Sequence, residues 1–136
     1  MAVSTNSIVT SQGLKTFNAV CTAAKTTFND STNVVSLAAA QTNGMIVYSL
    51  KALARATVTA TKLQLYRSPD AGTTYYLIAT ATMAAYTMAN TDSQTATDFG
   101  FSETNPLRVA STDTLYVGAG VALAGGIVFD CQAEVL

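Results

Sequence analysis

The chain contains no histidine among its 136 residues, and this absence limits the chemistry that it can perform. Histidine is the base of Ser–His and Cys–His nucleophile pairs, the commonest general base and a frequent metal ligand. The sequence shows no other catalytic constellation in its place. We therefore expect a protein that is not an enzyme, with no catalytic residue, no metal site and no cofactor.

Cysteine is scarce as well, since Cys21 and Cys131 are the only two. They are too few for a disulfide framework and too far apart in the sequence for a chelating pair. We expect both to be small buried hydrophobic side chains, and thiols in a reducing cytoplasm. Both fall on the expected core face of their strands, so they could lie close together if the first and last strands are neighbours.

Charge is the third shortage. Charged side chains make up 11% of the chain, against about 25% in typical soluble domains, while hydrophobic residues reach 49%. Such a surface is expected to be covered in large part by copies of the protein or by a partner. The alternative is a monomer that its threonine and serine hydroxyls keep soluble.

The few charges also exclude two classes of partner. Seven basic residues oppose eight acidic ones, and the basic residues never cluster, so nucleic-acid binding lacks its electrostatic footprint. Apolar stretches are interrupted before the ~20 residues that a membrane helix needs. The start at Met1 shows no basic region followed by an apolar core. We expect synthesis in the cytoplasm and neither a nucleic-acid nor a membrane partner.

The clearest structural signal is a β-hairpin over residues 57–82. Two β-favouring runs, residues 61–67 and 73–82, flank a turn. In this turn a proline fixes φ, an aspartate can accept hydrogen bonds from backbone N–H groups just ahead of it, and a glycine supplies positive φ. The turn-forming residues are Ser68, Pro69, Asp70 and Gly72.

Other segments alternate in the same way. Residues 34–39, 45–55, 114–123 and 127–135 are predicted strands, the last two joined as a hairpin by Gly125 and Gly126. In residues 45–55 the pattern places Ile46, Tyr48, Leu50 and Ala52 on one face. Residues 14–28 fit a helical face or a strand, and their threonine content favours the strand.

These strands predict an all-β domain over residues 14–136, an antiparallel β-sandwich of about eight strands. The pattern does not separate a jelly-roll from an Ig-like topology. Residues 1–13 are polar and aperiodic, and we interpret them as a flexible N-terminal arm that a neighbour could order. Residues 83–98 form a connection too long for a compact domain unless it is functional or partly structured.

Small residues give one strand face an unusual shape. In residues 114–123 the apolar positions alternate with Tyr116, Gly118 and Gly120, so one face is nearly flat. A flat face lets another backbone approach closely. We expect contacts with other subunits or with a partner to include this face, the arm and the long connection, at Val3, Ile8, Tyr86, Met88, Gly118 and Gly120.

Two groups of side chains are candidate ligand sites, and each also has a simpler interpretation. The acidic side chains of Asp92, Asp98 and Glu103 could form a weak calcium site, but plain solvated loop charges are the favoured interpretation. The six tyrosines could form a sugar-stacking platform, although core packing or subunit contact is favoured for most of them.

Residues 68–75 resemble an Asp-box, the S-x-D-x-G-x-T-aromatic hairpin of sialidase-type propellers. The motif occurs once here, whereas those propellers repeat it. The resemblance implies a turn-shaping role away from any active site, so a hairpin held by Asp70 is preferred to a glycan-hydrolysing function.

From Thr32 onward the order of motifs resembles small virion proteins encoded in the structural modules of tailed bacteriophages, some of which are capsid decoration (cement) proteins. The similar segments cover about three quarters of the chain, and residues 107–117 also look like the late strand pair of trimeric jelly rolls. The segments are Asn33 to Leu37, Asn43-Gly44, Leu63 to Arg67, Tyr75 to Leu77, Pro106 to Val109 and Thr112 to Val117.

This resemblance implies a mechanical role on the outside of the virion. Copies, with a homotrimer favoured, would bind the major capsid protein and stabilise the head. The alternatives are a phage tail or fibre component and a carbohydrate-binding β-sandwich module.

Overall fold

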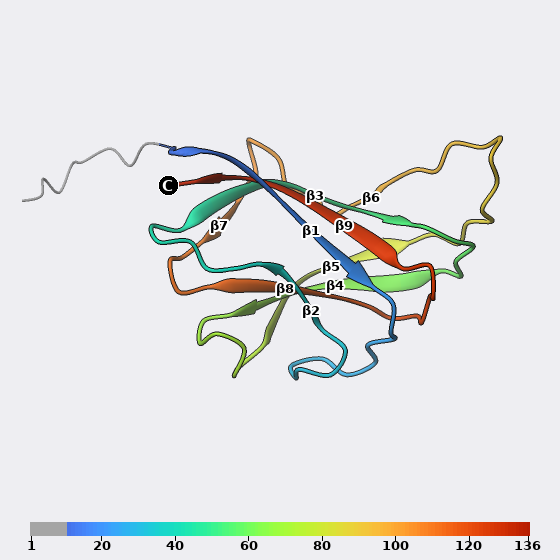
Figure 1. The fold of residues 1–136 in the computed structure, drawn as a ribbon, viewed down its shortest axis with the longest axis horizontal. Helices are drawn as coiled ribbons and strands as arrows, with labels where there is room; N and C mark the ends of the chain where they lie inside the picture. Colours follow the sequence, from blue (N-terminus) through green and yellow to red (C-terminus); the bar gives the residue numbers. More distant parts are fainter. Residues whose placement is uncertain (1–10) are drawn as a thin grey trace, which may run out of the picture.

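The computed structural model describes residues 11–136, which form two antiparallel β-sheets packed face to face (Figure 1). In this part of the chain no helix occurs, and so none that could cross a membrane. The strands are β1 (Gly13–Cys21), β2 (Val35–Ala38), β3 (Met45–Ala54), β4 (Thr61–Ser68), β5 (Tyr76–Met83), β6 (Thr97–Asp98), β7 (Leu107–Val109), β8 (Thr114–Ala119) and β9 (Ile127–Val135).

The strands pair in a nested order. β1 pairs with β9, β2 with β8, β3 with both β6 and β7, and β4 with β5. Sheet A has the order β1-β9-β3-β6, with β7 also on β3, and sheet B has the order β2-β8-β4-β5. This is the order of a jelly roll, in which one long hairpin folds around the core. The predicted β-sandwich is confirmed, and the strand order selects the jelly roll over the Ig-like alternative.

The core lies between the inner faces of the two sheets. In β9, Phe129, Cys131 and Ala133 are buried while the residues between them are partly or fully exposed. In β4, Leu63 and Leu65 are fully buried and face this core. The alternation in β9 fixes its register, because a one-residue slip would move every apolar side chain of that strand to the wrong face.

The predicted faces of β3 are correct in its second half and wrong in its first. Leu50 and Ala52 are buried, but Met45 and Val47 are buried in place of Ile46 and Tyr48. The cause is a register shift between Val47 and Ser49 in the pairing with β9. One extra residue at a β-bulge inverts the alternation, and the side-chain pattern alone does not locate it.

The predicted hairpin of residues 114–135 is wrong. β8 ends at Ala119 and belongs to sheet B, whereas β9 belongs to sheet A. Residues 120–126 cross between the sheets, and a turn closes where the N–H of Gly126 donates to the carbonyl of Leu123 at 2.9 Å. Val121 and Leu123 still pack against the core, which explains why the apolar alternation continues beyond the strand.

The N-terminal strand is shorter than residues 14–28 and begins slightly earlier, at Gly13. The N–H of Gln12 donates to the carbonyl of Val135 at 2.7 Å, so the last residues of the predicted arm already belong to sheet A. Residues 1–10 lie outside the described part of the chain. The predicted contacts Val3 and Ile8 therefore lie outside it too.

The first and last strands are neighbours, which is the condition under which the two cysteines could have lain close together, but the two thiols are out of register. Cys21 pairs with Ile127 and Cys131 with Phe17, four positions apart and about 13 Å along the strands. Both cysteines are free and buried, and burial raises the pKa of each thiol to about 12.

We therefore expect neither thiol to react with an aromatic disulfide reagent in the native protein at pH 8, because thiolates are the reactive species. In guanidinium chloride both of the chain's two cysteines should react. A colorimetric thiol titration measures this directly. Rapid stoichiometric reaction without denaturant would contradict the buried placement.

Candidate functional site

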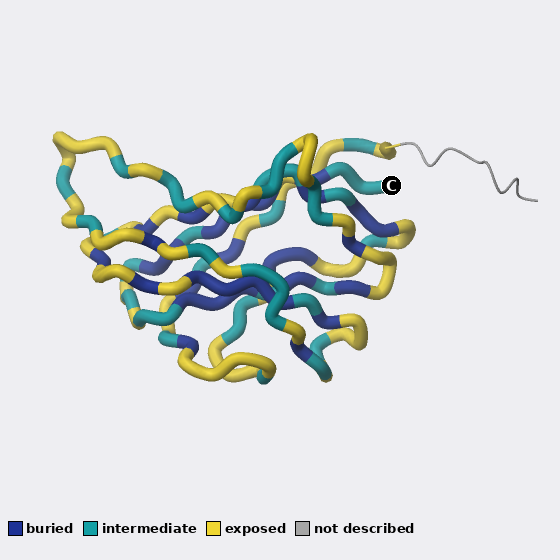
Figure 2. Tube along the Cα trace, turned by 180° about the vertical axis from the view of Figure 1, so that it is seen from behind, coloured by how far each residue is buried: buried dark blue, intermediate teal, exposed yellow. Residues whose placement is uncertain are grey.

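The most distinctive surface feature is a groove beside the long loop of residues 84–96. This loop projects from one end of the sandwich and is largely exposed (Figures 1 and 2). The groove has a volume of about 560 Å³ and is lined by residues 80–86 and 93–98. We call this surface the edge groove, because one wall is the end of β5 and the other includes β6.

The loop is pinned at both ends. Backbone hydrogen bonds of 2.9 Å join Val58 and Tyr86 in both directions, and the Tyr86 hydroxyl donates to the carbonyl of Asp92 at 3.1 Å. At the far end, the N–H of Phe99 donates to the carbonyl of Leu50, and its ring lies 6.2 Å from that of Phe129. The expected long connection is thus partly structured and anchored to the core.

The lining of the edge groove is made mostly of small side chains and carries little charge. Most of its lining side chains are threonine or alanine, and Asp98 is its one charged lining residue. Tyr86 lines the groove and is half-buried, while Met88 follows it in the loop with 39% of its surface exposed. Such a surface suits an extended polypeptide, which makes backbone hydrogen bonds and small apolar contacts.

The flat face of β8 is not open to another subunit along its length. A Cβ added to Gly118 would lie 2.8 Å from both Lys25 Cδ and Gln64 Oε1, so this chain's own residues already occupy the space. Gly120 is half-buried, with Thr61 Oγ1 2.9 Å from the same position on it. The small residues do permit a close approach, as expected. At Gly118, however, the group that approaches is the chain's own segment of residues 22–34 and not a second molecule.

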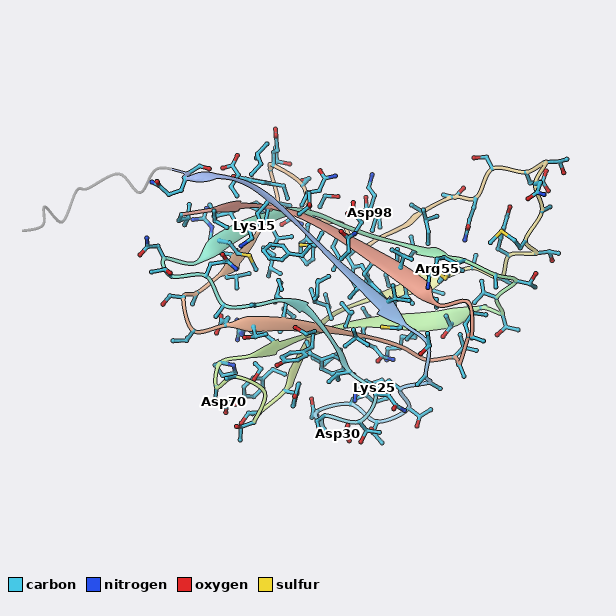
Figure 3. The ribbon with its side chains drawn as sticks, in the orientation of Figure 1. Lys15, Lys25, Asp30, Arg55, Asp70 and Asp98 are labelled. Atoms are coloured by element: carbon cyan, nitrogen blue, oxygen red, sulfur yellow. The ribbon has the colours of Figure 1, made fainter. Side chains whose placement is uncertain are left out.

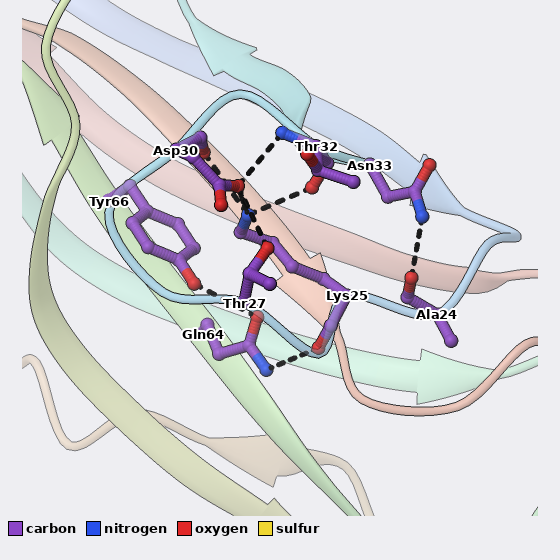
Figure 4. Close-up of polar contacts among 8 residues, drawn as sticks. All are labelled: Ala24, Lys25, Thr27, Asp30, Thr32, Asn33, Gln64 and Tyr66. Atoms are coloured by element: carbon purple, nitrogen blue, oxygen red, sulfur yellow. Dashed lines mark hydrogen bonds and ion pairs between the residues drawn. The ribbon is translucent and has the colours of Figure 1, made fainter.

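Lys25 holds this segment over the outer face of sheet B (Figures 3 and 4). Its side chain is 0% exposed, and Nζ donates to the carbonyl of Asp30 at 3.1 Å, to Asp30 Oδ1 at 2.9 Å and to the carbonyl of Thr32 at 2.8 Å. Nζ also lies 5.1 Å from the centroid of the Tyr66 ring, a cation–π contact. The ammonium group therefore uses all three donors and has none left for a substrate.

A second layer of hydrogen bonds connects this cluster to β4. The Tyr66 hydroxyl donates to Gln64 Oε1 at 3.2 Å, and Gln64 Nε2 donates to the carbonyl of Lys25 at 3.4 Å. Asn33 Nδ2 donates to the carbonyl of Ala24 at 2.6 Å. We call Lys25, Asp30, Gln64 and Tyr66 the lysine clasp. Sequence analysis did not predict it, although Lys25 stands alone just before a Thr-x-x-Asp loop, and that arrangement was a usable signal.

The lysine clasp also lowers the pKa of its acidic member, Asp30. Hydrogen bonds from Lys25, Thr27 and the Thr32 backbone lower the pKa of Asp30 from 3.8 to about 2. A carboxyl whose pKa is lower in the folded than in the unfolded state stabilises the fold above its unfolded pKa. That contribution is lost as the pH falls through the folded value.

We therefore expect acidification from pH 5 to pH 2 to destabilise the wild type more than an Asp30→Asn variant. The comparison is made by chemical denaturation at each pH. Equal losses in the two proteins would show that Asp30 carries no folding-linked proton.

The turn of residues 68–75 is built around Asp70, which lies at the opposite end of sheet B from the edge groove (Figure 3). Its Oδ1 accepts hydrogen bonds from the N–H groups of Thr73 at 3.2 Å and Thr74 at 2.7 Å, and from Ser68 Oγ at 3.0 Å. Hydrogen bonds from Thr74 above all lower the pKa of Asp70. Gly72 has a φ of 97°, and its N–H donates to Ser68 Oγ. These contacts give Asp70 a turn-holding role.

The tyrosines are spread over different environments. Tyr66 and Tyr75 are buried, Tyr48, Tyr86 and Tyr116 are half-buried, and Tyr76 is 50% exposed. Tyr75 and Tyr116 pack edge to face with ring centroids 5.0 Å apart. Core and turn packing therefore account for most of these rings, and this distribution does not favour a sugar-stacking platform.

The acidic residues Asp92, Asp98 and Glu103, for which solvated loop charges were the favoured interpretation, do not form a metal-binding group. Within residues 11–136, no group of three or more acidic or cysteine side chains is placed to hold a metal ion. Asp98 Oδ1 instead accepts a hydrogen bond from the N–H of Gly100 at 2.8 Å, which shapes the loop after β6.

The chain matches no protein-family model, no curated protein and no solved structure. The fold, the edge groove and the composition are therefore the properties from which its function has to be inferred.

Proposed function

We propose that this protein is a non-enzymatic structural component of a virion, a decoration protein that binds the outside of a phage head and stabilises it. The observation that carries the proposal is the edge groove with its projecting loop. This groove lies at one end of the sandwich and has one charged lining residue, Asp98, in a chain of which only 11% of the residues are charged.

The composition suits repeated side-to-side contact. Desolvating threonine and alanine costs less than desolvating charged groups, so a neutral surface can be buried many times over in a lattice. Contacts of this kind change little with ionic strength, because few ion pairs contribute to them. The partner is the major capsid protein, and the protein's site is the outer capsid surface.

The test is binding to assembled heads of the virus that encodes this chain. Purified protein is mixed with heads that lack it, sedimented and quantified against free protein. We expect saturable co-sedimentation. A Met88→Asp variant should bind at least tenfold more weakly, because it places a charge on an exposed side chain of the projecting loop.

The matched control is Thr26→Asp, an exposed position on the segment of residues 22–34. It introduces the same charge away from the edge groove and should bind as the wild type does. Failure to sediment with heads, combined with binding to tails, would replace this proposal with the tail or fibre alternative. Binding to neither, together with binding on a glycan array, would favour the carbohydrate-binding alternative.

A further inference from the structure

The edge groove lies between two strand edges that have no partner in the described structure. β5 pairs only with β4, and β6 pairs only with β3. An edge strand presents unpaired N–H and C=O groups, which can pair with an added strand. The side chains along this edge are small, with Thr80 and Thr82 exposed, so an incoming backbone would meet little obstruction.

Residues 2–10 of the chain have the composition of such an added strand. They contain valine, isoleucine and threonine, no proline or glycine, and no charged side chain. β-branched residues favour a strand, and proline would prevent a continuous ladder. The absence of charge matches a groove whose lining includes a single carboxylate, that of Asp98.

The groove of the same molecule is poorly placed to receive this segment. Gly13 lies level with Met45 across β9, whereas β6 lies level with Lys51 and Ala52, at the other end of β3. Figure 1 shows the start of β1 and the projecting loop at opposite ends of the sandwich. Gly13 and β6 are thus seven positions apart along the strands and three strand spacings apart across them, a separation of about 27 Å.

An extended chain advances about 3.3 Å per residue, so about eight residues would be used to reach the groove. Counted back from Gly13, those eight residues take the chain to residue 5, so only about four residues would remain to pair along the groove. In an assembly, the groove of a neighbouring molecule can lie next to this segment. All of residues 2–10 would then be available to pair with that groove.

We propose that residues 2–10 of one copy bind as an added β-strand in the edge groove of a second copy. The donor and acceptor surfaces differ, so the interface is head-to-tail and closes into a ring when the rotation between copies allows it. This inference does not depend on the proposed role on the capsid, because it concerns the protein alone.

The test uses a fluorescent peptide of residues 1–12 and a variant lacking residues 2–9, whose groove has no donor. We expect saturable binding in an anisotropy titration, and none with a scrambled peptide. Thr82→Lys, added to the same variant, should weaken binding at least tenfold, because an edge lysine opposes strand pairing. Thr26→Lys is the matched control and should leave binding unchanged.

Full-length proteins give a second measurement by light scattering after size exclusion. The wild type and Thr26→Lys should form the same oligomer, while Thr82→Lys should shift towards the monomer. A peptide that does not bind, or that binds the Thr82→Lys protein equally well, overturns the inference. Since no capsid is present, these results stand apart from the head-binding experiment.

Discussion

Replacing Lys25 with alanine is expected to lower the free energy of unfolding by about 3 kcal/mol, as measured by denaturant titration. The lysine stem is buried against the outer face of sheet B, so its removal leaves a cavity. The carbonyls of Asp30 and Thr32 also lose their donor. The Asp30 side chain is 46% exposed and can be hydrated, so the cost comes mainly from the lysine stem and the two carbonyls.

A Lys25→Met variant separates these two contributions. Methionine keeps most of the buried stem but not the ammonium group, so we expect it to lose about half as much stability as alanine does. Equal losses in both variants would assign the whole effect to the hydrogen bonds. A loss below ~1 kcal/mol for alanine would show that the lysine clasp does not hold the segment of residues 22–34 in place.

The parts of the fold that sequence analysis predicted are those governed by local pattern. β9 matches its predicted bounds, and the β4–β5 hairpin follows from two β-favouring runs around the Asp70 turn. In each case the side chains that alternate also face the single core, so period and burial agree. The lack of a period in residues 83–98 likewise predicted the long connection between β5 and the later strands.

What sequence analysis could not predict depends on pairing between distant strands. The bulge in β3 appears only when its register against β9 is known, and the separation of β8 from β9 follows from the nested order of the whole sandwich. The edge groove requires β5 and β6, from different sheets, to lie beside each other. None of these relations can be predicted from the local alternation of apolar and polar residues.

The lysine clasp was missed for a related reason. Lysine is expected on the surface, and its burial becomes favourable only when carbonyls and a carboxylate surround it. These partners come from Asp30 and Thr32, and the surface against which the lysine stem packs comes from β4 and β8. The flat glycine face was noticed in the sequence, but its occupant was expected to be a second molecule.

Gly118→Ala tests directly what occupies that face, and we expect it to destabilise the protein by about 1–3 kcal/mol. The new Cβ would lie 2.8 Å from Lys25 Cδ and 2.8 Å from Gln64 Oε1. Neither group can move freely, because Lys25 Nζ makes three hydrogen bonds and Gln64 is bonded to Tyr66. Denaturant unfolding of the purified variant gives the measurement.

The decisive form of this experiment is a double-mutant cycle with Lys25→Ala. Removing the lysine stem opens space for the new methyl group, so the double variant should be more stable than the sum of the single losses by at least ~0.5 kcal/mol. Gly120→Ala is the matched control, since its Cβ would meet Thr61 and Lys62 instead of Lys25. Its loss should add to that of Lys25→Ala. Strict additivity at Gly118 as well would mean that Lys25 does not occupy the glycine face in solution, leaving that face open for the subunit contact first inferred from the sequence.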